Sequence, residues 1–166
     1  MGLNWYALWV KSRHEFIARD ELANKGVETF LPTVVKLQQW RDRKKNVEFP
    51  VFPGYLFVSL ERSAEDFQRA TKSRGTVALV CLEPGQPTPV VPEEIRALQA
   101  LFACGLPFDV YSNLQEGARV RIERGPLQGI EGVLTKKREQ HLFCVNIEIL
   151  GRSVALRVCP DDIVQA

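Results

Sequence analysis

Residues Phe49–Leu60 read FPVFPGYLFVSL, and this stretch decides how the first half of the chain folds. Successive side chains of a strand point to opposite faces, so the alternation can be followed from Tyr55 onward. Leu56, Val58 and Leu60 share one face, and Tyr55, Phe57 and Ser59 share the other. We therefore predict a strand that covers a core with its aliphatic face and presents two aromatic rings on its second face.

The segments around this strand predict an α+β domain of about 100 residues. Residues 5–10 form a short apolar run that fits a strand covered on both faces, and Ser12 to Glu15 form a capping box that starts a helix. After the central strand, Ser63 caps a short helix through about Lys72, and residues 76–81 read as another strand. Pro92 opens a last helix that Gly105 ends, so helices pack against a mainly antiparallel sheet.

From Gly117 onward the helical period disappears and short alternating strands replace it. Turn signals at hairpin spacing, such as Gly125-Pro126, Gly151 and Pro160-Asp161, separate these strands. This pattern predicts a small β-barrel of about 50 residues. Residues 104–113 show no periodicity and read as a linker.

Composition excludes several classes of function. The chain has 166 residues, 45% of them hydrophobic, and a net charge of only +2. It has no apolar run near the ~18 residues of a membrane span, and its first residues lack the features of a signal peptide, so we expect a cytoplasmic protein. Four cysteines without a Cys-x-x-Cys pair, and only two histidines, predict no metal site, no cofactor and no enzymatic activity.

Two groups of motifs give the chain a family resemblance. Trp5-Tyr6-Ala7, Phe52–Val58 and Ser73-Arg74-Gly75 resemble the N-terminal domain of NusG-type transcription elongation factors. Residues 117–122, Gly125-Pro126, 129–133 and 150–152 resemble the KOW module, an SH3-like barrel that ends the same proteins. The resemblance implies an N-terminal domain at 1–103, a linker at 104–113 and a KOW domain at 114–166.

The same resemblance implies a docking surface for RNA polymerase. In family members, aromatic residues at the positions of Tyr55 and Phe57 grip the coiled-coil clamp helices of the polymerase, and Phe52 and Pro53 shape the rim of that surface. Large aromatics on an uncovered sheet face suit such a contact. The alternative is that Tyr55 and Phe57 lie under a helix as ordinary core residues.

Basic side chains imply contacts with nucleic acid. Lys11, Lys25 and Arg74 resemble the surface that faces non-template DNA in specialised members; the alternative is an ordinary solvated surface. A second group surrounds Trp40 and resembles a basic loop near the upstream duplex, although an exposed hairpin tip would look the same. This group consists of Lys36, Arg41, Arg43, Lys44 and Lys45.

In the KOW module, loop positions imply a further partner. Leu127, Ile130, Leu150 and Arg152 match positions that in relatives meet a small-subunit ribosomal protein or the termination factor Rho. Exposed apolar loop tips form a reasonable docking surface. The alternative is that these residues plug the end of the barrel.

The pattern as a whole predicts a monomeric bacterial elongation factor that suppresses pausing or termination. Residues 30–33, 40–45 and 47–50 are more similar to operon-specific paralogues of polysaccharide gene clusters, the RfaH and UpxY kind, than to the housekeeping protein. Asp66-Phe67-Gln68 replaces the His-Thr-Thr motif of RfaH, and Phe49 replaces its domain-locking acid, so autoinhibition is not expected. The alternatives are a housekeeping NusG that couples polymerase to Rho or the ribosome, and an RNA- or ribosome-binding KOW protein.

Overall fold

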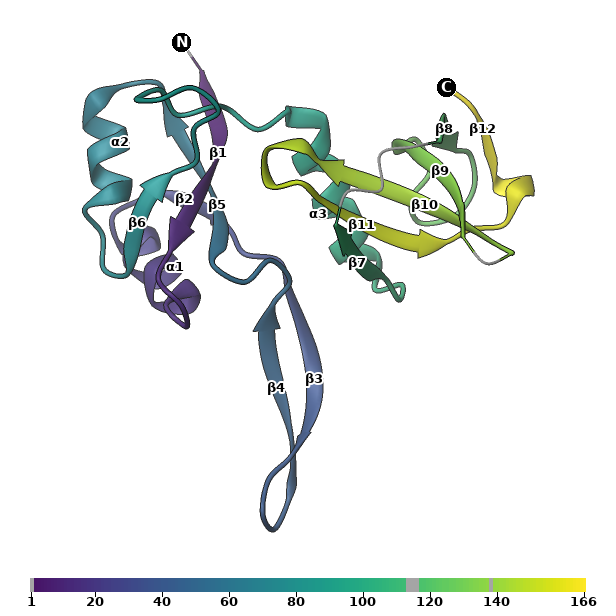
Figure 1. Cartoon of the computed structure of the whole chain (residues 1–166), viewed down its shortest axis with the longest axis horizontal. Helices are drawn as coiled ribbons and strands as arrows, with labels where there is room; N and C mark the ends of the chain where they lie inside the picture. Colours follow the sequence, from purple (N-terminus) through teal and green to yellow (C-terminus); the bar gives the residue numbers. More distant parts are fainter. Residues whose placement is uncertain (1, 113–116, 138) are drawn as a thin grey trace. The chain divides into compact units, whose positions relative to one another are not determined.

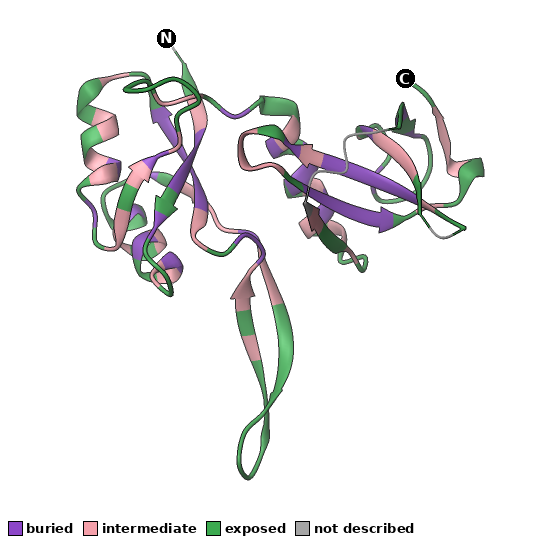
Figure 2. Ribbon diagram, viewed as in Figure 1, coloured by how far each residue is buried: buried purple, intermediate pink, exposed green. Residues whose placement is uncertain are grey.

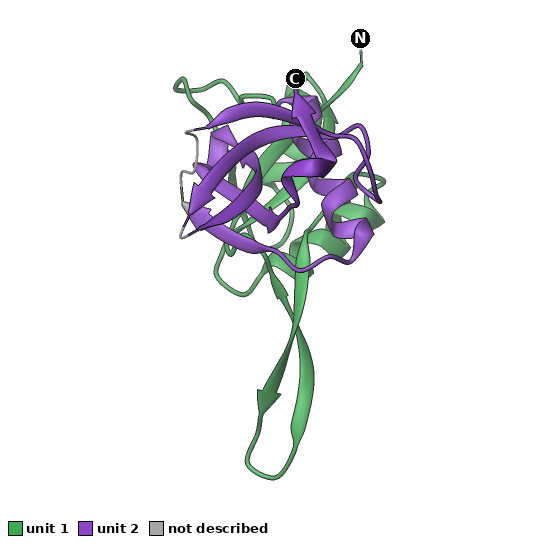
Figure 3. Cartoon of the chain, turned by 90° about the vertical axis from the view of Figure 1, so that its right-hand side faces the viewer, with its two compact units in different colours: residues 1–89 green, residues 90–166 purple. Residues whose placement is uncertain are grey.

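The computed structural model describes residues 2–112, 117–137 and 139–166, which divide into compact units at 1–89 and 90–166 (Figure 3). The boundary between the units in the sequence follows Pro89, whereas the predicted functional domains are separated by the linker at 104–113. Residues 113–116, where the predicted linker gives way to the KOW domain, lie outside the described residues. The functional boundaries therefore stay a prediction, and each unit is described by itself.

The first unit is built on a four-stranded antiparallel sheet in the order β2-β5-β1-β6 (Figure 1). The strands are β1 (Leu3–Val10), β2 (Glu28–Phe30), β5 (Tyr55–Glu61) and β6 (Thr76–Leu79). Two helices, α1 (Glu15–Asn24) and α2 (Ala64–Thr71), pack on one face and form the core with it. On that face lie Tyr6, Leu8, Val10, Leu56, Val58 and Leu60, as the alternation in β5 predicts.

The two helices begin in different ways. Ser63 caps α2 as predicted, because its Oγ accepts a hydrogen bond from the Asp66 amide at 3.2 Å. The predicted capping box at Ser12–Glu15 is wrong. His14 is the N-cap of α1 and makes no side-chain capping bond, and the Glu15 carboxylate turns to a different partner.

A hairpin of β3 (Thr33–Gln39) and β4 (Lys44–Pro50) forms a two-stranded sheet of its own. It extends away from the four-stranded sheet in Figure 1. Its strands pair in register from Thr33 opposite Pro50 to Gln39 opposite Lys44. All residues from 35 to 46 are exposed (Figure 2). The basic segment predicted from the sequence is therefore the outer part of a ribbon.

The second unit consists of α3 (Pro92–Cys104) and a six-stranded antiparallel sheet in the order β12-β8-β9-β10-β11-β7. The strands are β7 (Asp109–Ser112), β8 (Ala118–Ile122), β9 (Glu131–Lys137), β10 (Gln140–Ile147), β11 (Arg152–Arg157) and β12 (Ile163–Gln165). Short 3-10 turns lie at Glu148–Leu150 and Pro160–Asp162. The fold is thus α+β followed by an all-β module, as predicted.

One difference concerns the predicted linker. Residues 109–112 form β7, which pairs antiparallel with β11, so part of this stretch belongs to the sheet of the second unit. A strand of four residues is too short to show a period, and its backbone partners lie 40 to 46 positions later in the chain. No helix among the described residues is long and apolar enough to cross a membrane.

Candidate functional site

The sheet of the first unit has a second face that carries large aromatic side chains. Strand β5 lies between β1 and β2, so residues of all three strands meet there. Trp9 lies opposite Tyr55, and Ala7 and Phe30 lie opposite Phe57 on either side. We call the following residues the aromatic face: Trp5, Trp9, Phe30, Tyr55 and Phe57.

Within this face, Trp9 is the most exposed ring. It is 51% exposed, while Trp5, Phe30 and Tyr55 are half-buried. Both α1 and α2 pack on the opposite side of the sheet. Tryptophan beside tyrosine offers a large, rigid apolar area with polar tips, which is the chemistry of a protein-docking surface.

Phe57 does not have the exposure predicted for it. Its side chain is fully buried, stacked on Phe30 at a centroid distance of 5.9 Å and met edge-on by Phe52 at 6.2 Å. The prediction of two bare rings is therefore wrong for Phe57, and Tyr55 alone of the pair reaches the surface. The reason is the strand order: β5 is flanked on both sides, so neighbouring rings close over its middle residue.

The predicted rim residues also separate. Pro53 is exposed at the turn before β5, whereas Phe52 is only 3% exposed and supports Phe57 from within. Phe52 is therefore a core residue of this region rather than a surface contact.

The turn that presents Tyr55 is held from three directions. The Gly54 amide donates to Glu15 Oε2 at 3.1 Å, and the Gly54 carbonyl accepts from the Val10 amide at 2.9 Å. The Tyr55 amide donates to the Phe52 carbonyl at 3.0 Å. Because Glu15 is 5% exposed, its carboxylate is an internal tie between α1 and the turn. These bonds fix where Tyr55 leaves the turn beside Trp9.

Trp5 and Trp9 were missed as surface residues because residues 5–10 read as a strand covered on both faces. A signal was present: Trp5, Ala7 and Trp9 alternate with Tyr6, Leu8 and Val10. Period two therefore places both tryptophans on one face. Whether that face is exposed depends on the pairing of β1 with β5, and the sequence of β1 alone does not contain this information.

The structure brings together the cations predicted to face non-template DNA. The Lys11 amide donates to the Gly75 carbonyl at 2.8 Å, next to Arg74. The Lys25 ammonium donates to Ser73 Oγ at 2.8 Å and lies 4.0 Å from a Glu21 carboxylate oxygen, and Glu21 also accepts from the Arg74 amide. The loop at 73–75 thus gathers three exposed basic residues, although Lys25 already has partners inside the chain.

The second predicted group of cations lies on the β3–β4 hairpin. Arg41 and Arg43 are in its turn, where the Trp40 amide donates to the Arg43 carbonyl at 2.7 Å. The Lys45 ammonium lies 5.6 Å from the centroid of the Trp40 ring, and the Lys36 ammonium lies 5.8 Å from that of Phe49. The exposed positions of all five cations suit contact with a polyanion.

The four loop positions of the second unit do not form one exposed set. Leu127 is only 3% exposed, so its prediction as an exposed docking residue is wrong. Ile130 and Leu150 are half-buried. Arg152 is exposed, and its Nη1 donates to the Leu150 carbonyl at 3.4 Å.

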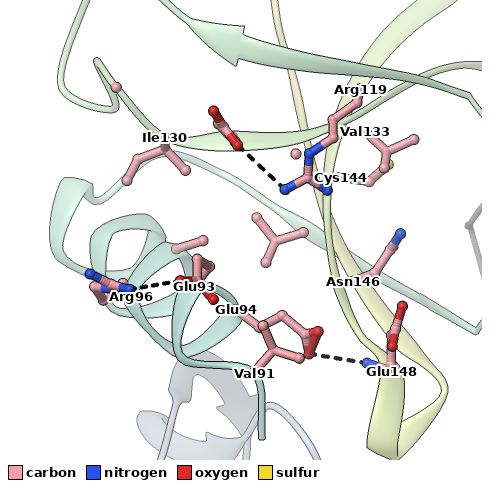
Figure 4. A pocket seen from close by; sticks show the side chains of 15 residues that line it. Val91, Glu93, Glu94, Arg96, Arg119, Ile130, Val133, Cys144, Asn146 and Glu148 are labelled. Carbon is pink, nitrogen blue, oxygen red and sulfur yellow. Dashed lines mark hydrogen bonds and ion pairs between the residues drawn. The ribbon is translucent and has the colours of Figure 1, made fainter. Parts of the chain in front are cut away.

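A cleft of about 840 Å³ lies in the second unit between α3 and strands β8, β9 and β10 (Figure 4). Two ion pairs border it: Arg96 with Glu93 at 3.0 Å and Arg119 with Glu131 at 3.4 Å. Glu94 accepts a hydrogen bond from the Glu148 amide at 3.2 Å. This bond ties the start of α3 to the 3-10 turn that follows β10.

Burial changes the acidity of two groups at this cleft. It raises the pKa of Glu94 from 4.5 to about 7; the bond from the Glu148 amide lowers that pKa, and the carboxylates of Glu148 and Glu93 raise it. Burial also raises the pKa of the Cys144 thiol. Among the residues that the structure describes, no group of three histidine, cysteine, aspartate or glutamate side chains is placed to hold a metal ion.

Comparison with known families matches residues 3–99, more than half of the chain, to the family NusG, described as "Transcription termination factor nusG". The chain is also similar to curated proteins called transcription termination/antitermination protein NusG. It is 26% identical over 177 residues to that of Borreliella burgdorferi, with 95% of this chain and 96% of the relative covered. It is 24% identical over 190 residues to that of Thermus thermophilus, with both chains covered completely.

A solved structure described as "Domain interaction in Thermotoga maritima NusG" has a similar fold. The match has a TM-score of 0.51 and 22% identity, and it covers 98% of this chain and 97% of the other.

Proposed function

The chain belongs to the NusG family, and from this premise we propose that it is a bacterial transcription elongation factor that binds RNA polymerase and acts as an antiterminator. In this proposal the aromatic face binds the clamp helices of the polymerase. The protein acts in the cytoplasm as a monomer and by binding alone, without catalysis. The polymerase-binding domain is residues 1–103, and the KOW domain is residues 114–166.

The observation that carries the proposal is the pair of Trp9 and Tyr55. They lie opposite each other on neighbouring strands, Trp9 is half exposed, and both helices of the unit lie on the other face of the sheet. Tryptophan and tyrosine are the residues most enriched at binding hot spots. Pro53, exposed at the adjacent turn, extends the same surface.

The mechanism follows from preferential binding to one state of the polymerase. In this proposal, elongating and paused polymerases differ in how far the clamp is open. A factor that holds the clamp helices with Trp9 and Tyr55, and touches DNA with its cations, stabilises the state in which both contacts fit. A difference of ~1.4 kcal/mol in its binding energy between the two states changes their ratio tenfold.

Nucleic-acid contacts complete the bridge in this proposal. Lys11, Lys25 and Arg74 face the non-template strand, and the cations of the β3–β4 hairpin face the upstream duplex. Three exposed cations on adjoining loops support the first contact, and a projecting basic ribbon supports the second. Both contacts are expected to weaken with salt, because they release counterions.

The proposed role is operon-specific, in keeping with the likeness of residues 30–33, 40–45 and 47–50 to the specialised paralogues. In the KOW domain, Ile130, Leu150 and Arg152 are the positions offered to a small-subunit ribosomal protein or Rho. Their partial or full exposure supports this, and the burial of Leu127 removes that residue from the proposed contact.

Pull-down with core RNA polymerase tests the proposed surface. Trp9→Ala with Tyr55→Ala should abolish retention, whereas Leu82→Ala should not, although Leu82 is 70% exposed and apolar. Retention of the double variant would overturn the aromatic face as the polymerase contact. An RNA- or ribosome-binding KOW protein would be unaffected by either change.

Transcription in vitro across a pause site and a terminator tests the proposed activity. Read-through should increase when the wild-type protein is added and should not increase with the Trp9→Ala, Tyr55→Ala variant. Earlier release in the presence of Rho would contradict antitermination and indicate the housekeeping activity instead.

A further inference from the structure

The β3–β4 ribbon is the most exposed part of the first unit. Among the strands that the structure describes, it pairs with neither larger sheet, and every residue from 35 to 46 is exposed. Val35 and Leu37, near its middle, are 61% and 62% exposed. A two-stranded ribbon alone in water is only marginally stable, so two aliphatic side chains left open on one face of it indicate a surface that is covered in use.

Pairing in the ribbon separates two faces of different chemistry. Leu37 lies opposite Asn46, Gln39 opposite Lys44, and Val35 opposite Glu48 at the base of the ribbon, so these residues share one face. Lys36, Gln38 and Lys45 lie on the other face, where the two lysines sit over the rings of Phe49 and Trp40. We call the first set the reading face: Val35, Leu37, Gln39, Lys44, Asn46 and Glu48.

The reading face combines the groups that recognise base edges. Glutamine and asparagine pair with adenine in a bidentate way, lysine donates to guanine O6 and N7, and aliphatic groups contact the thymine methyl. Within the described part of the chain, Gln39 Nε2 donates only to the adjacent Trp40 carbonyl, at 3.3 Å and at an exposed position. The other face, in contrast, carries cations of the kind that bind phosphates without regard to sequence.

Dimensions of the ribbon fit the major groove of B-form DNA. That groove is about 12 Å wide and admits a two-stranded ribbon, whereas the major groove of A-form RNA is too narrow and deep for side chains to read. An antiparallel strand rises about 3.4 Å per residue, close to the spacing of base pairs along each strand. The five exposed residues of β3, 35–39, would therefore follow about 4–5 base pairs.

We propose that the β3–β4 ribbon inserts into the major groove of double-stranded DNA, with the reading face toward the base edges and Lys36, Lys45, Arg41 and Arg43 toward the phosphates. The ribbon then gives this chain a sequence preference of its own. The inference rests on the proposed contact of the hairpin with duplex DNA and specifies what that contact recognises.

Selection from a pool of duplex DNA with a randomised central segment tests this inference with the full chain. The enriched duplex should be bound at least ~10-fold more tightly than a scrambled duplex, as measured by fluorescence anisotropy. It should also be preferred over its single strand and over an RNA duplex of the same sequence. Absence of an enriched sequence, or equal binding of the single strand or RNA, would overturn the inference.

Paired variants locate the preference on the ribbon. Gln39→Ala with Asn46→Ala should bring the ratio of selected to scrambled binding close to 1. Lys36→Gln with Lys45→Gln should weaken both duplexes alike and reduce the slope of log K against log salt by about 1.8. All four positions are exposed, so both variants should keep the wild-type circular dichroism. If the Gln39→Ala, Asn46→Ala variant kept the sequence preference, the proposed role of the reading face would be wrong.

No polymerase is present in this assay. Failure here leaves the proposed polymerase contact standing, and failure of the pull-down leaves this inference standing.

Discussion

Gly54 donates its amide hydrogen to Glu15 Oε2 at 3.1 Å, across 39 positions of the sequence. The bond joins the first residue of α1 to the turn from which Tyr55 emerges. Since Glu15 is buried, the carboxylate replaces water as the partner of this amide. The position of the exposed rings therefore depends on a residue that is not itself at the surface.

Loss of this carboxylate should destabilise the first unit. Glu15→Ala leaves the Gly54 amide without an acceptor, which should lower the free energy of unfolding by about 1.5–3 kcal/mol, as for hydrogen bonds to charged groups. Glu15→Gln keeps an acceptor and should lose less. Denaturant unfolding measures both, with Glu65→Ala in the first turn of α2 as a control, because the Glu65 side chain is 84% exposed. Equal stability of Glu15→Ala and wild type would contradict the tie.

Phe57 and Tyr55 should differ in the kind of damage that their removal causes. Phe57→Ala empties a fully buried site and should cost about 3–5 kcal/mol of stability. Tyr55→Ala and Trp9→Ala affect more exposed rings and should each cost about 1 kcal/mol or less. Both of these should weaken polymerase retention while the protein stays folded. Loss of retention in Phe57→Ala without loss of stability would show that Phe57 is a direct contact after all.

The contrast between these two rings shows how far the sequence alone could go. Alternation along 55–60 predicted the strand and both of its faces, because period two is a local property. Burial of Phe57 depends on β5 lying between β2 and β1, with Phe30 stacked on its ring. That order is set by pairing between distant segments. The same is true of the exposed Trp9, whose face is defined only by its partner Tyr55.

Other features of the fold also fall into those that the local sequence predicts and those that depend on distant partners. Ser63 was recognised as the cap of α2 because a capping side chain acts within three residues. The partner of Glu15 was missed because the local alternative, a capping box, matches the sequence pattern equally well. Strand β7 was missed because four residues carry too little period to be seen, and its partner β11 lies far along the chain. Local signals were thus readable, and long-range pairings were not.

Tyr6 should tolerate the loss of its hydroxyl. The side chain is fully buried, and its hydroxyl oxygen has no hydrogen-bond partner within the described part of the chain. Tyr6→Phe should therefore raise the free energy of unfolding by up to about 1 kcal/mol. It keeps the edge contact with Phe67, whose ring centroid lies 5.3 Å away. Tyr6→Leu removes that contact as well and should be less stable than Tyr6→Phe. A loss of stability in Tyr6→Phe would show that the hydroxyl has a partner, such as ordered water.

Docking of α3 on the sheet of the second unit should depend on pH through Glu94. The folded pKa of about 7 lies above the ordinary value of 4.5, so the folded state holds a proton that the unfolded state releases. The contribution of Glu94 to the free energy of unfolding is therefore at its full value below pH 4.5, and it is lost as the pH rises through 7. The Glu148 amide resonance should titrate with a midpoint near 7, because that amide donates to Glu94. Glu94→Gln should abolish this titration, whereas Glu83→Gln, at an exposed position in the first unit, should leave it intact.

Substitutions of Lys25 and Arg74 should have different effects. Loss of Arg74 should affect only the attraction to DNA, whereas loss of Lys25 should also lower stability. The side chain of Arg74 is exposed, so Arg74→Gln should leave stability unchanged and reduce the salt slope of binding to single-stranded non-template DNA by about 0.7. The Lys25 ammonium also holds the buried Ser73, so Lys25→Gln should lose about 0.5–1.5 kcal/mol of stability in addition. Binding to a reconstituted elongation complex over a range of salt measures the slopes, with Lys136→Gln in the second unit as the control. If Lys25→Gln changed stability but not the slope, Lys25 would serve only to fix the loop at 73–75, and Lys11 with Arg74 would carry the attraction to DNA.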